Sequence, residues 1–284
     1  MLDSDGCSPG SDCCRHMQQS DAAGQGHEMI VRRSPAELAK LRRSGLLVYE
    51  ILQKLKDMVA EGVTTQELEN AAVRLIAEAG AKPAFKGYVS QASKVRYPFV
   101  LCTSVNEEVV HGMPSGRRKL KPGDIVSIDT GVLLDGYYGD SAVTVAVGEP
   151  NDSVKRLLKV TEESLELAIG QVRAGNRLFD ICGTVEKHVT SHGFSIVREF
   201  VGHGIGTSLH EEPQIPNYID RNNENPRLKP GMVLAIEPMV NAGKPETKVL
   251  SDKWTAVAKD GSYSAHFEHM VAVTDNGPWV LSRP

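Results

Sequence analysis

The apolar positions that follow Met29 recur with a helical period in two segments, and each segment opens with a capping signal. Ser34-Pro35-Ala36-Glu37 combines a capping box with proline at the first helical position. This pattern predicts an amphipathic helix that runs to about Glu61. Thr64-Thr65-Gln66-Glu67 starts a second helix in the same way, and Gly80 closes it.

The helical pattern returns later in the chain. A shift of 113 residues places Val59, Gly62, Leu68, Ile76 and Gly80 on Val172, Gly175, Ile181, Val189 and Gly193. A repeat of this length indicates that one supersecondary unit has been duplicated. We therefore expect a second pair of helices.

The segments that follow each helix pair repeat more plainly. LKPGDIVSID, Leu120–Asp129, aligns with LKPGMVLAIE, Leu228–Glu237, without a gap at an offset of 108 residues. Each begins with a Pro-Gly turn and continues with the alternation typical of a strand. The sequence thus predicts two α+β halves, about 29–150 and 151–284, related by a pseudo-twofold axis. Asp129 and Glu237 occupy equivalent points of the sheet.

A hairpin in the first half brings two carboxylates together. Asp135-Gly136 is a favoured two-residue turn between the predicted strands 125–134 and 137–147. In the register set by that turn, Asp129 is a diagonal neighbour of Asp140 on the same face of the sheet. The prediction holds if neither strand contains a bulge.

Two further acids lie in apolar stretches of the second half, Glu237 in VLAIEPMV and Glu268 in SAHFEHMVAV. Each acid taken alone is most simply interpreted as a hydrogen-bonded strand end. Four carboxylates on one sheet face would require neutralisation. Two divalent cations, chosen from manganese, iron(II), cobalt and zinc, suit such an oxygen-rich hydrolytic site.

Several histidines lie in settings that suggest chemistry. His203 stands among glycines in GHGIG, which is not the dinucleotide fingerprint because the third glycine comes one residue early. We expect His203 to be a metal ligand and His210 a nearby hydrogen-bond donor. His111, before a Gly-Met-Pro turn, is placed to reach the same cleft. His266 and His269 are interpreted as structural neighbours of the carboxylate between them.

Composition narrows the class of protein. The chain has 284 residues, of which 40% are hydrophobic and 24% charged, with a net charge of -4. These values describe one soluble domain or two small ones and exclude a disordered chain, a collagen and a small disulfide scaffold. After residue 28 the acidic and basic residues balance, so no specific nucleic-acid partner is expected. No apolar run approaches a membrane span or a signal peptide, which predicts a cytoplasmic protein.

The first 28 residues differ from the rest. They are rich in Gly, Ser, Asp and Gln and contain Cys7, Cys13 and Cys14. The spacing of these cysteines fits no usual zinc pattern. We expect residues 1–28 to be a disordered, dispensable extension or a mis-assigned start, and residues 29–284 to form a single catalytic domain.

From about Met29 onward the chain resembles the type I, bacterial-type methionine aminopeptidases of the pita-bread fold. The motifs that carry the resemblance are CTSVNEEVVHGMP, DIVSIDTGVLLDGYYGD, EFVGHGIGTSLHEEP, GMVLAIEPMVNAGK and FEH before a strand. The resemblance implies an α+β fold with a curved antiparallel sheet covered by helices. It also implies a monomeric enzyme that removes the N-terminal methionine from peptides and nascent chains when the next residue is small.

The resemblance implies a metal-ligand set, namely Asp129, Asp140, His203, Glu237 and Glu268. Asp140 and Glu268 would bridge two cations. Asp129 would complete the shell of one cation, and His203 with Glu237 that of the other.

By the same resemblance, Glu237 would take a proton from the attacking water, and His111 and His210 would bind the scissile amide and stabilise the oxyanion. The implied pocket for the methionine side chain uses residues that would serve equally well in a core: Tyr88, Tyr97, Cys102, Leu209 and Trp254.

This sequence departs from the family pattern at a few positions. The stretch between Tyr88 and Tyr97 is longer, Val110 stands where many members have cysteine, and Leu209 where an aromatic residue is frequent. Two alternatives stay open: an X-Pro aminopeptidase of the same fold, and an inactive relative that binds peptides, RNA or ribosomes. Nascent-chain substrates raise the question of a ribosome contact, but the basic loop 117–119 is better explained as a solvated turn.

Overall fold

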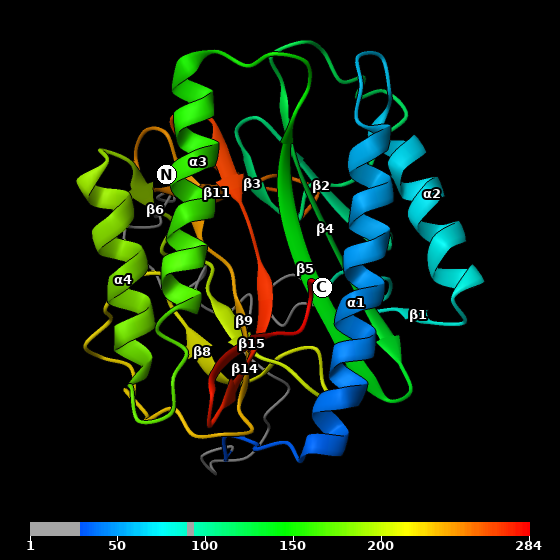
Figure 1. Ribbon diagram of the computed structural model, residues 1–284. Helices are drawn as coiled ribbons and strands as arrows, with labels where there is room; N and C mark the ends of the chain where they lie inside the picture. The colour runs from blue at the N-terminus through cyan, green and yellow to red at the C-terminus, as the bar shows by residue number, and fades with distance from the viewer. Residues whose placement is uncertain (1–28, 90–93) are drawn as a thin grey trace, which may run out of the picture.

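Two pairs of helices lie in front of the strands, one pair on each side of the molecule (Figure 1). The computed structural model describes residues 29–89 and 94–284; the predicted extension 1–28 lies outside the described residues. The helices of the described part are α1 (Pro35–Met58), α2 (Thr65–Glu78), α3 (Asp152–Ile169) and α4 (Leu178–Ser191).

The predicted helix starts are confirmed. Ser34 and Thr64 cap α1 and α2, and in both cases the glutamate three residues on completes the capping box. The end of α1 is a correction, because the helix stops at Met58 rather than near Glu61. The N–H of Gly62 donates to the carbonyl of Leu120 at 2.8 Å, so a contact with a distant segment draws the chain out of the helix.

The strands of the described residues form four hydrogen-bonded sheets, and every strand pair among them is antiparallel. The sheets have the orders β1-β4-β2 with β5 beside β4, β13-β10-β6, β11-β12-β3 and β15-β14-β9-β7-β8. In the first half the strands are β1 (Lys82–Pro83), β2 (Leu101–Val105), β3 (Glu108–Val110), β4 (Ile125–Leu134) and β5 (Tyr137–Ala146). In the second half they are β6 (Ser195–Ile196), β7 (Gly202–Gly204), β8 (Glu211–Ile215), β9 (Val233–Ile236), β10 (Met239–Asn241), β11 (Thr247–Val249), β12 (Ala256–Ala258), β13 (Ser264–His266), β14 (His269–Thr274) and β15 (Gly277–Val280).

The duplicated plan is visible in the backbone and in the packing. Gly62 after α1 and Gly175 after α3 adopt the same left-handed conformation, with φ of 84° and 95°. One apolar core joins α1 and α2 to β2 and β4, and another joins α3 and α4 to strands of the second half. The predicted α+β class is therefore confirmed.

The two halves meet where β5 lies beside the start of β14. Ala142 and Glu268 form an isolated antiparallel bridge, and the N–H of Glu268 donates to the carbonyl of Ala142 at 2.9 Å. The hydroxyl of Ser141 donates to the carbonyl of Glu268 at 2.6 Å. This junction brings a carboxylate of the second half next to the strand that carries Asp140.

Candidate active site

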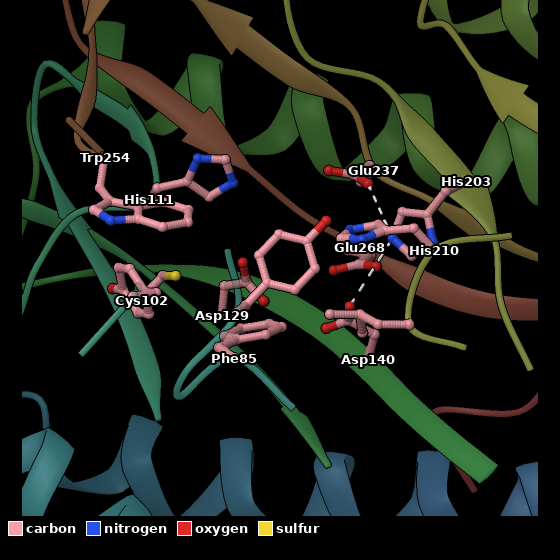
Figure 2. Close-up of a pocket in the computed structure, with 13 residues that line it drawn as sticks. Phe85, Cys102, His111, Asp129, Asp140, His203, His210, Glu237, Trp254 and Glu268 are labelled. Atoms are coloured by element: carbon pink, nitrogen blue, oxygen red, sulfur yellow. Dashed lines mark ion pairs between the residues drawn. The ribbon is translucent and has the colours of Figure 1, made fainter. Parts of the chain in front are cut away.

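A cavity opens at the junction of the two halves. Its walls contain every site residue predicted from the sequence, together with one further residue, Phe85. The predicted residues on its walls are Tyr88, Tyr97, Cys102, His111, Asp129, Asp140, His203, Leu209, His210, Glu237, Trp254 and Glu268. The side chains of Asp140, His203, His210, Glu237 and Glu268 gather on one side, those of Cys102, His111 and Trp254 lie on the other, and Asp129 and Phe85 lie between the two groups (Figure 2).

The hairpin of the first half presents two of the acids. Gly131 pairs with Asp140 and Asp129 with Ala142, and no bulge interrupts the ladder between β4 and β5. Because side chains two residues apart on a strand point to the same side, Asp129 and Asp140 share one face. The predicted register is confirmed.

The second half contributes His203, Glu237 and Glu268 from β7 and from the residues that follow β9 and β13. The Nε2 atom of His203 lies 3.7 Å from Glu237 Oε1 and 4.0 Å from Asp140 Oδ2. Ligand atoms of Asp140, His203 and Glu268 lie within 4.8 Å of one another. Side chains from both halves thus converge on one point.

The orientation of His203 suits a ligand. Its Nδ1 atom lies 2.9 Å from the carbonyl oxygen of Gly204, so Nδ1 carries the proton and donates it to that carbonyl. The lone pair then resides on Nε2, which faces the carboxylates. A backbone acceptor on the far nitrogen is the usual device that fixes the tautomer of a metal-binding imidazole.

Buried polar atoms without a hydrogen-bond partner concentrate here. Within residues 29–89 and 94–284 these atoms at the site are Asp129 Oδ1, Asp140 Oδ1, Glu268 Oε1, His111 Nδ1, His210 Nδ1, Trp254 Nε1 and His266 Nε2. Buried polar groups are otherwise almost always paired. Carboxylate oxygens left open toward one point, beside an imidazole lone pair, fit divalent cations.

The carboxylates of the site are buried close together, and their pKa values are raised. Burial raises the pKa of Glu237 to about 7, with His203 opposing the rise, and burial raises that of Asp129 to about 7. Burial and the charges of neighbouring acids hold the pKa of Asp140 and of Glu268 well above the usual value. Four acids in a low dielectric repel one another, and bound cations would relieve that repulsion.

His111 and His210 face the same cavity. Burial lowers the pKa of His111 to about 4 and that of His210 well below its usual value, so both imidazoles are neutral near pH 7. The His210 ring packs against the rings of His203 and Tyr88, with centroids 4.4 and 5.3 Å apart. His111 has a φ of 60°, a conformation that is uncommon outside glycine and often marks a functional site.

Aromatic rings line the opposite wall. The ring of Trp254 lies 5.1 Å from that of Tyr97 and 6.5 Å from that of Tyr88, measured between centroids. The Tyr97 hydroxyl donates to the carbonyl of Leu101 or Gly112, 2.9 and 3.1 Å away. These contacts fix the shape of an apolar recess beside the carboxylates.

One residue of the cavity wall, Phe85, was not predicted from the sequence. Phe85 lies in a loop and belongs to none of the motifs. His266, interpreted from the sequence as a structural neighbour of Glu268, also places its Nε2 atom 3.6 Å from Glu237 Oε2. His266 ends β13 and pairs with Met239 of β10, two residues after Glu237.

In the described residues no helix is long and apolar enough to cross a membrane.

Comparisons with known proteins agree with this geometry. Residues 39–275 match metallopeptidase family M24. The chain is 49% identical over 255 residues to methionine aminopeptidase 1 of Bacillus subtilis, covering 90% of this chain and 100% of that protein. It is 43% identical over 251 residues to the methionine aminopeptidase of Escherichia coli K12, covering 88% of this chain and 92% of that protein.

Among solved structures, a methionine aminopeptidase from Thermotoga maritima superposes with a TM-score of 0.85 at 42% identity, covering 90% of this chain and 100% of that one. The shared pita-bread architecture explains why two pseudo-symmetric halves meet at the cavity. The chain belongs to metallopeptidase family M24, among the methionine aminopeptidases of the bacterial type.

Proposed function

We propose that this chain removes the N-terminal methionine from peptides and nascent proteins when the next residue is small, with the help of two divalent cations. One observation carries the proposal: carboxylates from both halves, with open oxygen atoms, meet His203 at one side of a cavity whose other side is apolar. The membership of the chain in a family of methionine aminopeptidases supports the same reaction.

The proposed ligands are Asp129, Asp140, His203, Glu237 and Glu268, and they suit manganese, iron(II), cobalt or zinc. Cations of this kind, when bound, lower the pKa of a water molecule and polarise the carbonyl that it attacks. The ligands in turn lose the repulsion between neighbouring acids that helps to raise the pKa of Asp140 and Glu268. Site and cations therefore stabilise each other.

Glu237 is proposed as the proton acceptor. Its carboxylate lies between the imidazoles of His203 and His266, at 3.7 and 3.6 Å. A carboxylate placed beside the attacking water can take up its proton. His111 and His210 are neutral, so each retains an N–H that can donate to the oxygen of the scissile carbonyl as negative charge develops there.

The apolar recess would hold the methionine side chain. Tyr88, Tyr97, Cys102, Leu209 and Trp254 line it, and thioethers pack favourably against aromatic rings. The free α-amino group of an N-terminus would replace a water molecule on one of the cations. This combination favours removal of a single terminal residue over cleavage within a chain.

Nascent chains are the natural source of such substrates. We therefore also propose a monomeric enzyme that works in the cytoplasm, where chains leave the ribosome. The loop 117–119 remains predicted as a solvated turn rather than a ribosome contact.

Mass spectrometry of a peptide mixture tests the proposal. Metal-free and metal-reconstituted protein is incubated with Met-Ala, Met-Lys and Arg-Pro peptides, and the variant Glu50→Gln, which changes an exposed acid of α1, serves as a control for Glu237→Gln. We expect metal-dependent cleavage of Met-Ala alone, lost in Glu237→Gln. Cleavage of Arg-Pro would instead favour the X-Pro aminopeptidases, and no cleavage with any metal would favour an inactive binding protein.

A further inference from the structure

A buried ion pair outside the proposed ligand set lies behind His210. Arg33, which precedes α1, contacts both carboxylate oxygens of Glu211 through Nη2. The two side chains are only 6% and 13% exposed. Charges this well buried are costly unless both partners are held in place. Both side chains of this pair contact segments that line the cavity or support its walls.

The carboxylate of Glu211 also organises the turn that carries His210. Its Oε1 atom accepts the backbone N–H groups of Thr207 and Ser208, at 2.8 and 3.0 Å, and the Thr207 hydroxyl at 3.3 Å. Glu211 therefore holds the start of the turn in place. The next two residues of the turn, Leu209 and His210, line the cavity.

Arg33 is itself fixed from several sides. Its backbone N–H donates to the carbonyl of Gly231 at 2.7 Å, and its Nη1 atom lies 3.7 Å from Glu37. A Cβ atom on Gly206 would lie 2.1 Å from Arg33 Nη2, so the guanidinium lies directly against the turn. The absence of a side chain at Gly206 is what permits this approach.

The same turn is tied to the strand that carries Asp140. The N–H of Tyr138 donates to the carbonyl of Gly206 at 2.8 Å. The hydroxyl of Tyr137 donates to Glu37 of α1 at 3.2 Å, and the carboxylate of Glu37 lies 3.7 Å from Arg33. A continuous set of contacts thus connects the first turn of α1, the start of β5 and the His210 turn.

We propose that Arg33 and Glu211 are positioning residues that hold the turn 206–210 so that Leu209 and His210 face the substrate. The part that concerns catalysis rests on the proposed function, since the role of His210 belongs to it. Arg33 neutralises the buried carboxylate, and that carboxylate accepts the donors of the turn. Without Arg33 the carboxylate would draw water or a proton, and the turn would loosen.

Four variants and a control test the inference. Arg33→Ala removes the cation, Arg33→Lys keeps a charge without the planar fork, and Glu211→Gln keeps one oxygen acceptor. The double variant Arg33→Glu, Glu211→Arg restores a pair of opposite charges, but it leaves no carboxylate at position 211 to accept the N–H groups of the turn. Arg32→Ala removes the neighbouring exposed arginine and is the matched control.

Two readouts are needed, and one does not depend on activity. Amide hydrogen exchange at Thr207 and Ser208 is measured on metal-free protein at a temperature where thermal unfolding shows the variant folded. The rate constant kcat and KM for a Met-Ala peptide are measured on protein loaded with cobalt. Direct measurement of cobalt affinity reveals whether the metal ligands are disturbed.

In Arg33→Ala we expect faster exchange at Thr207 and Ser208 and a fall in kcat on the order of 10²-fold, the effect of misplacing a reacting group by about 1 Å. Cobalt affinity stays unchanged. Arg33→Lys recovers part of kcat, Glu211→Gln lies between Arg33→Ala and the wild type, and Arg32→Ala matches the wild type. The double variant Arg33→Glu, Glu211→Arg does not recover kcat. If the ion pair only stabilised the fold, this variant would recover kcat.

Unchanged amide hydrogen exchange at Thr207 and Ser208 in Arg33→Ala would overturn the inference. Full recovery of kcat in the double variant Arg33→Glu, Glu211→Arg would also overturn it. A wild-type protein that cleaves no Met-Ala peptide in any metal form would refute the proposed function instead. In that case the amide hydrogen exchange at Thr207 and Ser208 still decides whether Arg33 holds the turn.

Discussion

Replacement of Glu237 by glutamine should make the metal-free protein more stable near neutral pH while it removes activity. Glu237 is 7% exposed, and burial raises its pKa from 4.5 to about 7. An acid whose folded-state pKa is raised binds more protons in the folded than in the unfolded state between these values. Its contribution to stability is therefore complete below pH 4.5 and is lost as the pH rises to about 7.

The size of the effect follows from the shift. Each pKa unit corresponds to about 1.4 kcal/mol, so the wild type loses about 2–3 kcal/mol from this group between pH 5 and pH 8. Glu237→Gln has no such group and escapes the loss. Glu237 also raises the pKa of Asp140 and Glu268, so its removal relieves those acids in the same direction.

Urea unfolding of chelator-treated protein at pH 5 and pH 8 measures the difference, with Glu50→Gln as the exposed control. Between pH 5 and pH 8, the free energy of unfolding of Glu237→Gln should rise by about 2–3 kcal/mol relative to that of the wild type. That of Glu50→Gln should stay close to the wild-type value at both pH values. Saturating manganese should reverse the order at pH 8, because the wild type binds it more tightly. A Glu237→Gln variant whose stability relative to the wild type does not change with pH would refute the electrostatic account.

Three further predictions concern the cavity and the core. His210→Ala and His111→Ala should each lower kcat on the order of 10²-fold without loss of bound metal; kinetics with metal analysis checks this, and a loss of metal would assign these residues to the ligand shell. Gly45→Ala places a Cβ atom 2.5 Å from the carbonyl oxygen of Leu281 and should cost roughly 1–3 kcal/mol in urea unfolding, whereas an unchanged midpoint would show that the contact relaxes freely. Burial holds the pKa of Cys102 well above its usual value, so the thiol should resist iodoacetamide at pH 8 in peptide mass spectrometry; modification at the rate of a free thiol would contradict its burial.

Signals confined to a few neighbouring residues predicted much of the fold. The capping boxes at Ser34 and Thr64 and the Asp-Gly turn before Tyr137 act through contacts three or four residues apart, so the sequence displays them directly. The turn also set the register that places Asp129 and Asp140 on one face. The repeat then supplied the plan of the second half.

What the sequence did not reveal depends on distant contacts. The end of α1 is set by a bond from Gly62 to Leu120, and Arg33 meets Glu211 across 178 positions. Such pairs leave no local pattern, because the free energy of each contact appears only after the sheets have assembled. The position of His266 beside Glu237 follows from the pairing of β13 with β10, which the sequence does not display.

The most direct test of the account is a titration of metal-free protein with cobalt, in which calorimetry counts bound ions while mass spectrometry follows methionine release from a Met-Ala peptide. The account predicts no release before metal is added, up to two ions bound per chain, and activity that rises with their binding. Methionine release at full rate from the metal-free protein would contradict it, and so would cobalt bound at the site without any release.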